Sequence, residues 1–136
     1  GGKRYAAPKP DGAEANGCRI VFSPARAQAR DRFLTVLQAC DAEPLPVAHE
    51  ESGTMSVLRI ADRIVALPKD GGLSRAAFEV RVPGDGQTYQ VLGAGLAAGA
   101  WRLSAAGEPP REIAVEGGKN TLYFESRGGA CRLEPL

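Results

Sequence analysis

Turn-forming residues recur along this chain at intervals too short for crossover helices, and this spacing constrains its fold more than any other feature. The 136 residues include 17 glycines and 10 prolines, which separate short stretches of alternating apolar and polar residues. Alternation with a period of two is typical of strands that bury one face. Parallel strands would need long crossover connections, usually helices, and these intervals leave no room for them. The sequence therefore predicts an all-β fold, an antiparallel β-sandwich of about nine or ten short strands.

The clearest pair of strands lies in the middle of the chain. Residues 76–82 alternate in polarity, and Phe78 and Val80 share one face. The sequence Pro-Gly-Asp-Gly at 83–86 predicts a tight turn, and residues 88–92 form a second apolar run. Two runs joined by so short a turn predict a β-hairpin.

The length of the chain fits one domain. Residues 1–17 combine prolines and glycines with few apolar side chains, which predicts a linker or an N-terminal arm. Residues 18–136 are then predicted to form the β-sandwich domain.

The segment at residues 32–40 leaves two alternatives open. Phe33, Leu34 and Leu37 would suit one face of a helix. The β-branched side chain of Val36 favours a strand instead. Local propensity does not decide between these two structures.

Composition argues against several classes of partner and cofactor. The 17 basic and 16 acidic residues nearly cancel, and no run of basic residues suggests binding of nucleic acid. No apolar run approaches the roughly 20 residues of a membrane-spanning helix. The chain contains no CxxC pair and one histidine, so neither a metal site nor any cofactor is predicted.

The cysteines number three, which is too few for a disulfide framework. Cys18 lies in the first predicted strand of the domain and Cys131 in the last. Sandwiches often bring such strands together, so Cys18 and Cys131 form a candidate disulfide.

No set of side chains in the sequence identifies a reaction. His49 is the only histidine, and Glu50 and Glu51 are its only close acidic companions. Neighbouring residues of a strand point to opposite faces, so the two glutamates are unsuited to work as a catalytic pair. No serine lies in a GxSxG context. We therefore assign no catalytic residue, and we expect His49 to be a solvated histidine.

The glycine-rich segment at residues 93–99 has the spacing GxGxxxG. A dinucleotide-binding loop needs a helix directly after it, whose N-terminus holds the pyrophosphate. A strand containing Trp101 is predicted there instead. The segment is therefore expected to be a wide turn between two strands.

Three aromatic residues are candidates for binding carbohydrate, namely Tyr89, Trp101 and Tyr123. Exposed aromatic rings offer a large, rigid contact surface to a sugar ring. Buried rings would instead belong to the core, and Trp101 fits that alternative better because it follows the wide turn.

Several segments together resemble the C-terminal β-sandwich region of heparinase II/III-like polysaccharide lyases. The most specific is Asp-Arg-Phe-Leu-Thr-Val-Leu-Gln at 31–38, which is similar to an Asp-x-Phe-Leu-x-Val-Leu segment of that family. Gly-Leu-Ala-Ala-Gly-Ala-Trp at 95–101 resembles its Gly-Leu-x-x-Gly-x-Trp turn, and the runs at 18–24 and 60–65 resemble further strands.

This resemblance implies a strand at residues 32–40 and a parent enzyme with an α/α-toroid ahead of this region. It implies a periplasmic or secreted enzyme that cleaves uronate-containing polysaccharide by β-elimination. The catalytic motifs of such lyases cannot be placed on this chain. The expected function is thus that of a non-catalytic accessory domain, which supports the catalytic region or lines the substrate cleft. The expected partner is the N-terminal catalytic region, with acidic polysaccharide as a further candidate.

The turn at residues 95–101 also resembles that of transthyretin-like and carboxypeptidase-regulatory-like sandwiches. The alternative function is therefore a free-standing carbohydrate-binding or transthyretin-like interaction module. Fold alone does not decide between these functions.

Overall fold

The computed structural model describes residues 4–6, 18–20, 23–26, 29, 32–39 and 43–136. The chain divides into two compact units, Gly1–Ala39 and Cys40–Leu136. The described residues contain strands and no helix.

The first unit contains a small two-stranded sheet. Strand β1 (Arg4–Ala6) pairs antiparallel with β2 (Cys18–Ile20). Strand β1 thus lies within the segment predicted to be a linker or arm, and the predicted domain boundary at residue 18 stays a prediction.

The prediction of a strand at residues 32–40 is wrong for residues 32–39, the part of this segment that the structure describes. Residues 32–39 belong to no strand or helix, and the Leu37 side chain is 86% exposed. A strand persists only where a neighbour accepts and donates its backbone hydrogen bonds. No described strand pairs with this segment, so its β propensity alone does not produce one.

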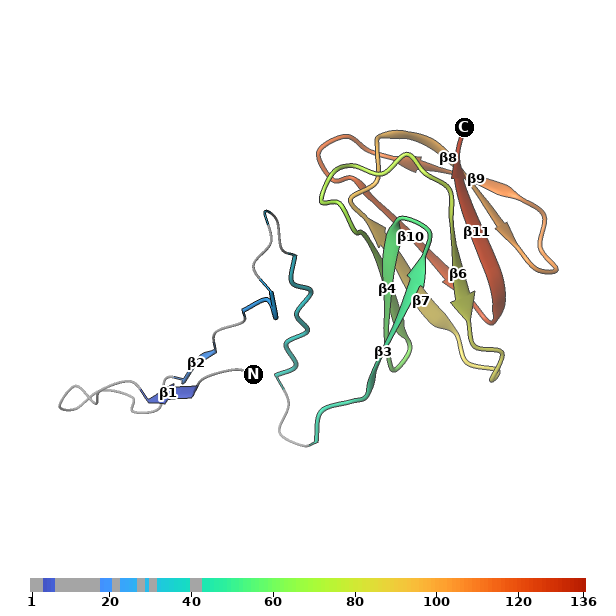
Figure 1. Ribbon diagram of the computed structural model, residues 1–136. Helices are drawn as coiled ribbons and strands as arrows, with labels where there is room; N and C mark the ends of the chain where they lie inside the picture. Colours follow the sequence, from blue (N-terminus) through green and yellow to red (C-terminus); the bar gives the residue numbers. More distant parts are fainter. Residues whose placement is uncertain (1–3, 7–17, 21–22, 27–28, 30–31, 40–42) are drawn as a thin grey trace. The chain divides into compact units, whose positions relative to one another are not determined.

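The second unit is a sandwich of two sheets (Figure 1). The five-stranded sheet has the order β10-β7-β5-β4-β3, and the four-stranded sheet has the order β6-β11-β8-β9. The strands of the first sheet are β3 (Val47–Ser52), β4 (Met55–Ile60), β5 (Arg63–Pro68), β7 (Tyr89–Ala94) and β10 (Thr121–Ser126). Those of the second are β6 (Phe78–Val82), β8 (Gly99–Ala105), β9 (Arg111–Val115) and β11 (Gly129–Pro135). The predicted all-β sandwich is confirmed.

The hairpin predicted from residues 76–82 and 88–92 is wrong. Strands β6 and β7 belong to different sheets, so residues 83–88 cross the sandwich instead of closing a hairpin. Strand β7 then pairs parallel with β5, and β6 in the opposite sheet provides the crossover. Asp85 shapes this crossing, because its side chain accepts a 2.7 Å hydrogen bond from the Tyr89 hydroxyl and one of 3.0 Å from the Gln87 amide.

The core lies between the sheets and consists of the inward-facing residues of their strands. Trp101 is buried near its middle, with its ring 6.2 Å from that of Phe78 in an edge-to-face arrangement. Edge-to-face aromatic pairs add about 0.5–1.5 kcal/mol beyond the burial of their area. Other fully buried side chains are Met55, Ile64, Val80, Val91, Leu103, Leu122 and Leu133.

The segment between β7 and β8 is the wide turn that the sequence predicts. Leu96 is completely buried at its centre. Its amide donates to the Asn120 carbonyl (3.0 Å), and the Asn120 side-chain amide donates to the Leu96 carbonyl (2.9 Å). The Trp101 indole donates to the Ala97 carbonyl (3.0 Å). The turn thus satisfies its buried polar groups while Leu96 fills the core.

Cys131 is a free thiol that is completely buried on β11. Its sulfur lies 3.5 Å from the Ser126 hydroxyl. Burial raises the pKa of this thiol, so its protonated form is favoured. Cys18, its predicted disulfide partner, belongs to the first unit and its side chain lies outside the described residues, so the disulfide stays a prediction. Burial of Cys131 among apolar side chains makes it a small core residue.

Replacing Gly95 with alanine should destabilise the sandwich by about 2–4 kcal/mol. Gly95 has φ +67°, and a Cβ there would approach the Pro68 Cδ to 2.8 Å. Gly107 has φ +80° and open space around it, so Gly107→Ala should cost only about 1–2 kcal/mol. Urea denaturation measures the free energy of unfolding of both variants. The difference between them gives the cost of the contact with Pro68, because both carry the cost of a positive φ. Equal losses would contradict close packing of the turn on Pro68.

Cys131 should react slowly with thiol reagents in the folded chain. In a Cys18→Ser/Cys40→Ser background, an aromatic disulfide reagent should label it at least about a hundredfold more slowly than in denaturant, because labelling requires local opening. Absorbance of the released thiolate measures the rate. Labelling at the unfolded rate, or a Cys18–Cys131 linkage found by mass spectrometry of the oxidised native chain, would contradict this assignment.

Candidate functional site

Two of the three aromatic candidates for carbohydrate binding are core residues. The exposed fraction is 1% for Trp101 and 3% for Tyr89. Neither ring has a face open to a ligand, so the prediction that these two rings could stack on sugar is corrected. The sequence could have indicated this burial, because residues two apart on a strand share a face. Tyr89 shares its face with buried Val91, and Trp101 shares its face with buried Leu103.

Tyr123 is the aromatic candidate that lies on the surface, with 52% of its side chain exposed. It alternates along β10 with buried Leu122 and Phe124. Its hydroxyl donates a 3.0 Å hydrogen bond to the Glu125 carboxylate, two residues further along β10. Partial burial and this hydrogen bond raise the pKa of Tyr123, so the hydroxyl stays protonated and able to donate.

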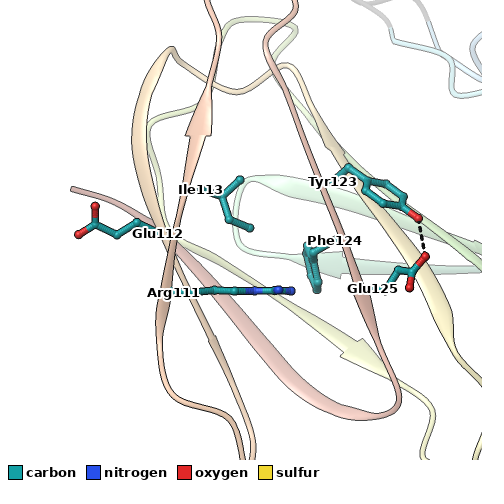
Figure 2. Close-up of a pocket in the computed structure, with 6 residues that line it drawn as sticks. All are labelled: Arg111, Glu112, Ile113, Tyr123, Phe124 and Glu125. Carbon is teal, nitrogen blue, oxygen red and sulfur yellow. Dashed lines mark hydrogen bonds between the residues drawn. The ribbon is translucent and has the colours of Figure 1, made fainter.

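A groove of about 430 Å³ lies between the edge strands β9 and β10, one from each sheet (Figure 2). We call it the edge groove, and its lining residues are Arg111, Glu112, Ile113, Tyr123, Phe124 and Glu125. Its volume falls within the range of pockets that take small ligands. It combines a cation, an exposed aromatic ring and apolar contacts.

Arg111 provides the positive charge of the edge groove. Figure 2 shows it extending from β9 toward Phe124, whereas Glu112 points away on the other side of β9. The side chain of Arg111 makes no hydrogen bond or ion pair with another described residue. The sequence did not single out Arg111, because finding it requires knowing that β9 and β10 are the edges that meet.

The outer face of the five-stranded sheet carries an apolar patch on β4, β5 and β7. Leu58, Val65 and Leu92 lie side by side across β4, β5 and β7, and all three are partly exposed. We call this surface the apolar face, and its residues are Leu58, Ile60, Val65, Leu67 and Leu92. The outer face of an antiparallel sheet is usually polar where it meets water.

The outer face of the four-stranded sheet is charged. Arg102 and Arg132 each lie 3.4 Å from the Glu134 carboxylate, and Arg81 lies 3.4 Å from that of Glu79. Exposed ion pairs of this kind contribute little to stability. They do keep this surface, which we call the charged face, compatible with water.

The acidic and histidine candidates form no catalytic group. His49 is exposed on β3, and Glu51 pairs with Lys69 at 3.0 Å. The hydrogen bond from Lys69 lowers the pKa of Glu51. No cluster of three or more His, Cys, Asp or Glu suited to a metal ion occurs among the described residues. In the same part of the chain, no helix is long and apolar enough to span a membrane.

Comparison with known proteins identifies one family. Residues 49–135 match the model of the heparinase II C-terminal domain family. No curated protein matches the chain. The family match covers well over half of the sequence and includes nearly the whole sandwich. The chain therefore belongs to the heparinase II C-terminal domain family.

Proposed function

We propose that this chain is the non-catalytic C-terminal accessory domain of a heparinase II/III-like polysaccharide lyase that acts on uronate-containing polysaccharide. In this proposal the apolar face packs against the catalytic region that precedes the domain. A periplasmic or secreted location belongs to the same proposal, because such polysaccharides are met outside the cytoplasm. The family match supports the parent region, and the apolar face is the observation that supports its docking.

The contrast between the two outer faces supports docking through one of them. Large aliphatic side chains from three neighbouring strands meet on the apolar face. The charged face presents ion pairs at the corresponding place on the other sheet. Contiguous exposed apolar surface commonly marks an interaction site. At about 25 cal/mol per Å², covering the remaining surface of each such side chain contributes up to about 1 kcal/mol.

The alternative of a free-standing carbohydrate-binding or interaction module gains no comparable support. That alternative expects a row of exposed aromatic rings, and Tyr89 and Trp101 are buried. A free-standing module would also have both outer faces in water, which the apolar side chains of one face do not favour.

The docking proposal predicts that polar substitutions on the apolar face release the domain in the longer lyase. Leu58→Thr/Val65→Thr should increase proteolytic separation of the domain at least about tenfold, the equivalent of about 1.4 kcal/mol, and should lower lyase activity. Threonine keeps β propensity, so the isolated chain should stay folded. Gel electrophoresis measures the release, and ultraviolet absorbance of the unsaturated uronate product measures the activity.

The matched control replaces two residues of the charged face, Arg102→Thr/Arg132→Thr. It should leave both release and activity close to those of the unaltered lyase, since those side chains are in water. Unchanged release in the Leu58 and Val65 variant would contradict docking through the apolar face. Product formed by the isolated 136-residue chain would contradict the non-catalytic role.

A further inference from the structure

We propose that the edge groove binds an acidic sugar, with Arg111 pairing with a carboxylate of the sugar and Tyr123 packing against its ring. The inference rests on the proposed function only for the choice of a uronate as the ligand. The groove itself lies at the seam between the sheets, where β9 and β10 are the edge strands.

Arg111 is placed to recognise an anion. It is the first residue of β9 and pairs in register with Leu103 of β8, so its backbone position is fixed by the sheet. Its side chain extends along the groove that Ile113 and Phe124 line (Figure 2). A guanidinium offers parallel donors that match the two oxygens of a carboxylate. These donors have no hydrogen-bond partner among the described residues and are free for a ligand.

Tyr123 provides a rigid surface for a sugar ring. Half of its side chain is exposed, and the hydrogen bond to Glu125 limits its rotation. A ring that is already oriented loses little entropy when a ligand packs on it. Sugar rings have C–H groups on their faces that pack well on an aromatic ring, so this surface favours a sugar over a simple anion.

The edge groove is lined by one cation, Arg111, and two carboxylates, Glu112 and Glu125. Glu112 points away from the groove, and the Glu125 carboxylate accepts the Tyr123 hydroxyl (Figure 2). Arg111 is thus the group of the groove that can pair with an anion, and its side chain extends toward Phe124.

Calorimetric titration of the 136-residue chain tests this inference. The ligands are a uronate-containing tetrasaccharide, a neutral tetrasaccharide and a short poly-glutamate peptide. The uronate ligand should bind, and the other two should bind at least about tenfold more weakly, since each lacks one of the two features recognised. Equal binding of the peptide would show that charge alone is recognised and would overturn the sugar assignment.

Variants of the groove locate the binding. Arg111→Gln should weaken uronate binding by about ten- to a hundredfold, because it removes a charged hydrogen-bond donor. Tyr123→Ala should weaken it by about five- to tenfold, whereas Tyr123→Phe should retain most of it. Arg102→Gln, an exposed arginine of the charged face, is the control and should change binding by less than about twofold.

A second variant keeps the test decisive if Arg111→Gln unfolds. Glu125→Gln removes a negative charge from the edge groove and should strengthen uronate binding. No binding of the uronate ligand, or full affinity in Arg111→Gln together with unchanged affinity in Glu125→Gln, would overturn the inference. Calorimetry on the isolated chain reports sugar binding by the edge groove, whereas proteolytic release of the domain in the longer lyase reports docking. The two experiments therefore distinguish a wrong groove proposal from a wrong proposed function.

Discussion

The sandwich depends most on the turn that joins its two sheets at residues 95–98. The chain leaves β7 in one sheet and enters β8 in the other at this point. Leu96 fills the core there, and its backbone is bonded on both sides to Asn120, the residue before β10. The Trp101 indole closes the turn on the Ala97 carbonyl. Backbone hydrogen bonds to Ser74 further hold the turn, at 2.8 Å from the Ser74 amide to the Gly95 carbonyl and 2.9 Å from the Ala97 amide to the Ser74 carbonyl.

This turn also determines which surfaces the domain offers. Because Asn120 is tied to Leu96, β10 begins at a fixed place on the edge of its sheet, and β9 ends at Val115 shortly before it. The edge groove is the seam that remains between these strands. The same arrangement leaves an apolar face on one sheet and a charged face on the other. Tyr123 of the edge groove pairs in register with Leu92 of the apolar face, so these two surfaces adjoin at β7 and β10.

Much of this fold could be predicted from the sequence, because alternation and turn chemistry are local. The apolar runs predicted at 76–82 and 88–92 contain or overlap β6 and β7, and the wide turn lies in the predicted segment 93–99. Which strands pair with each other does not depend on local sequence. The alternating patterns of β6 and β7 would fit a hairpin as well as they fit the two opposite sheets in which these strands lie. For the same reason the sequence did not identify Arg111, whose place in the groove depends on the edge strands β9 and β10 lying next to each other. The burial of Tyr89 and Trp101 followed from parity with Val91 and Leu103 and could have been read from the sequence.

The central claim is that the apolar face belongs to an interface between this domain and a preceding catalytic region. An experimental structure of the proposed parent lyase, by crystallography or electron microscopy, tests it most directly. The account predicts that Leu58 and Val65 contact the catalytic region while the edge groove stays open to solvent. A structure in which both residues face solvent, or in which the charged face forms the interface, would contradict it.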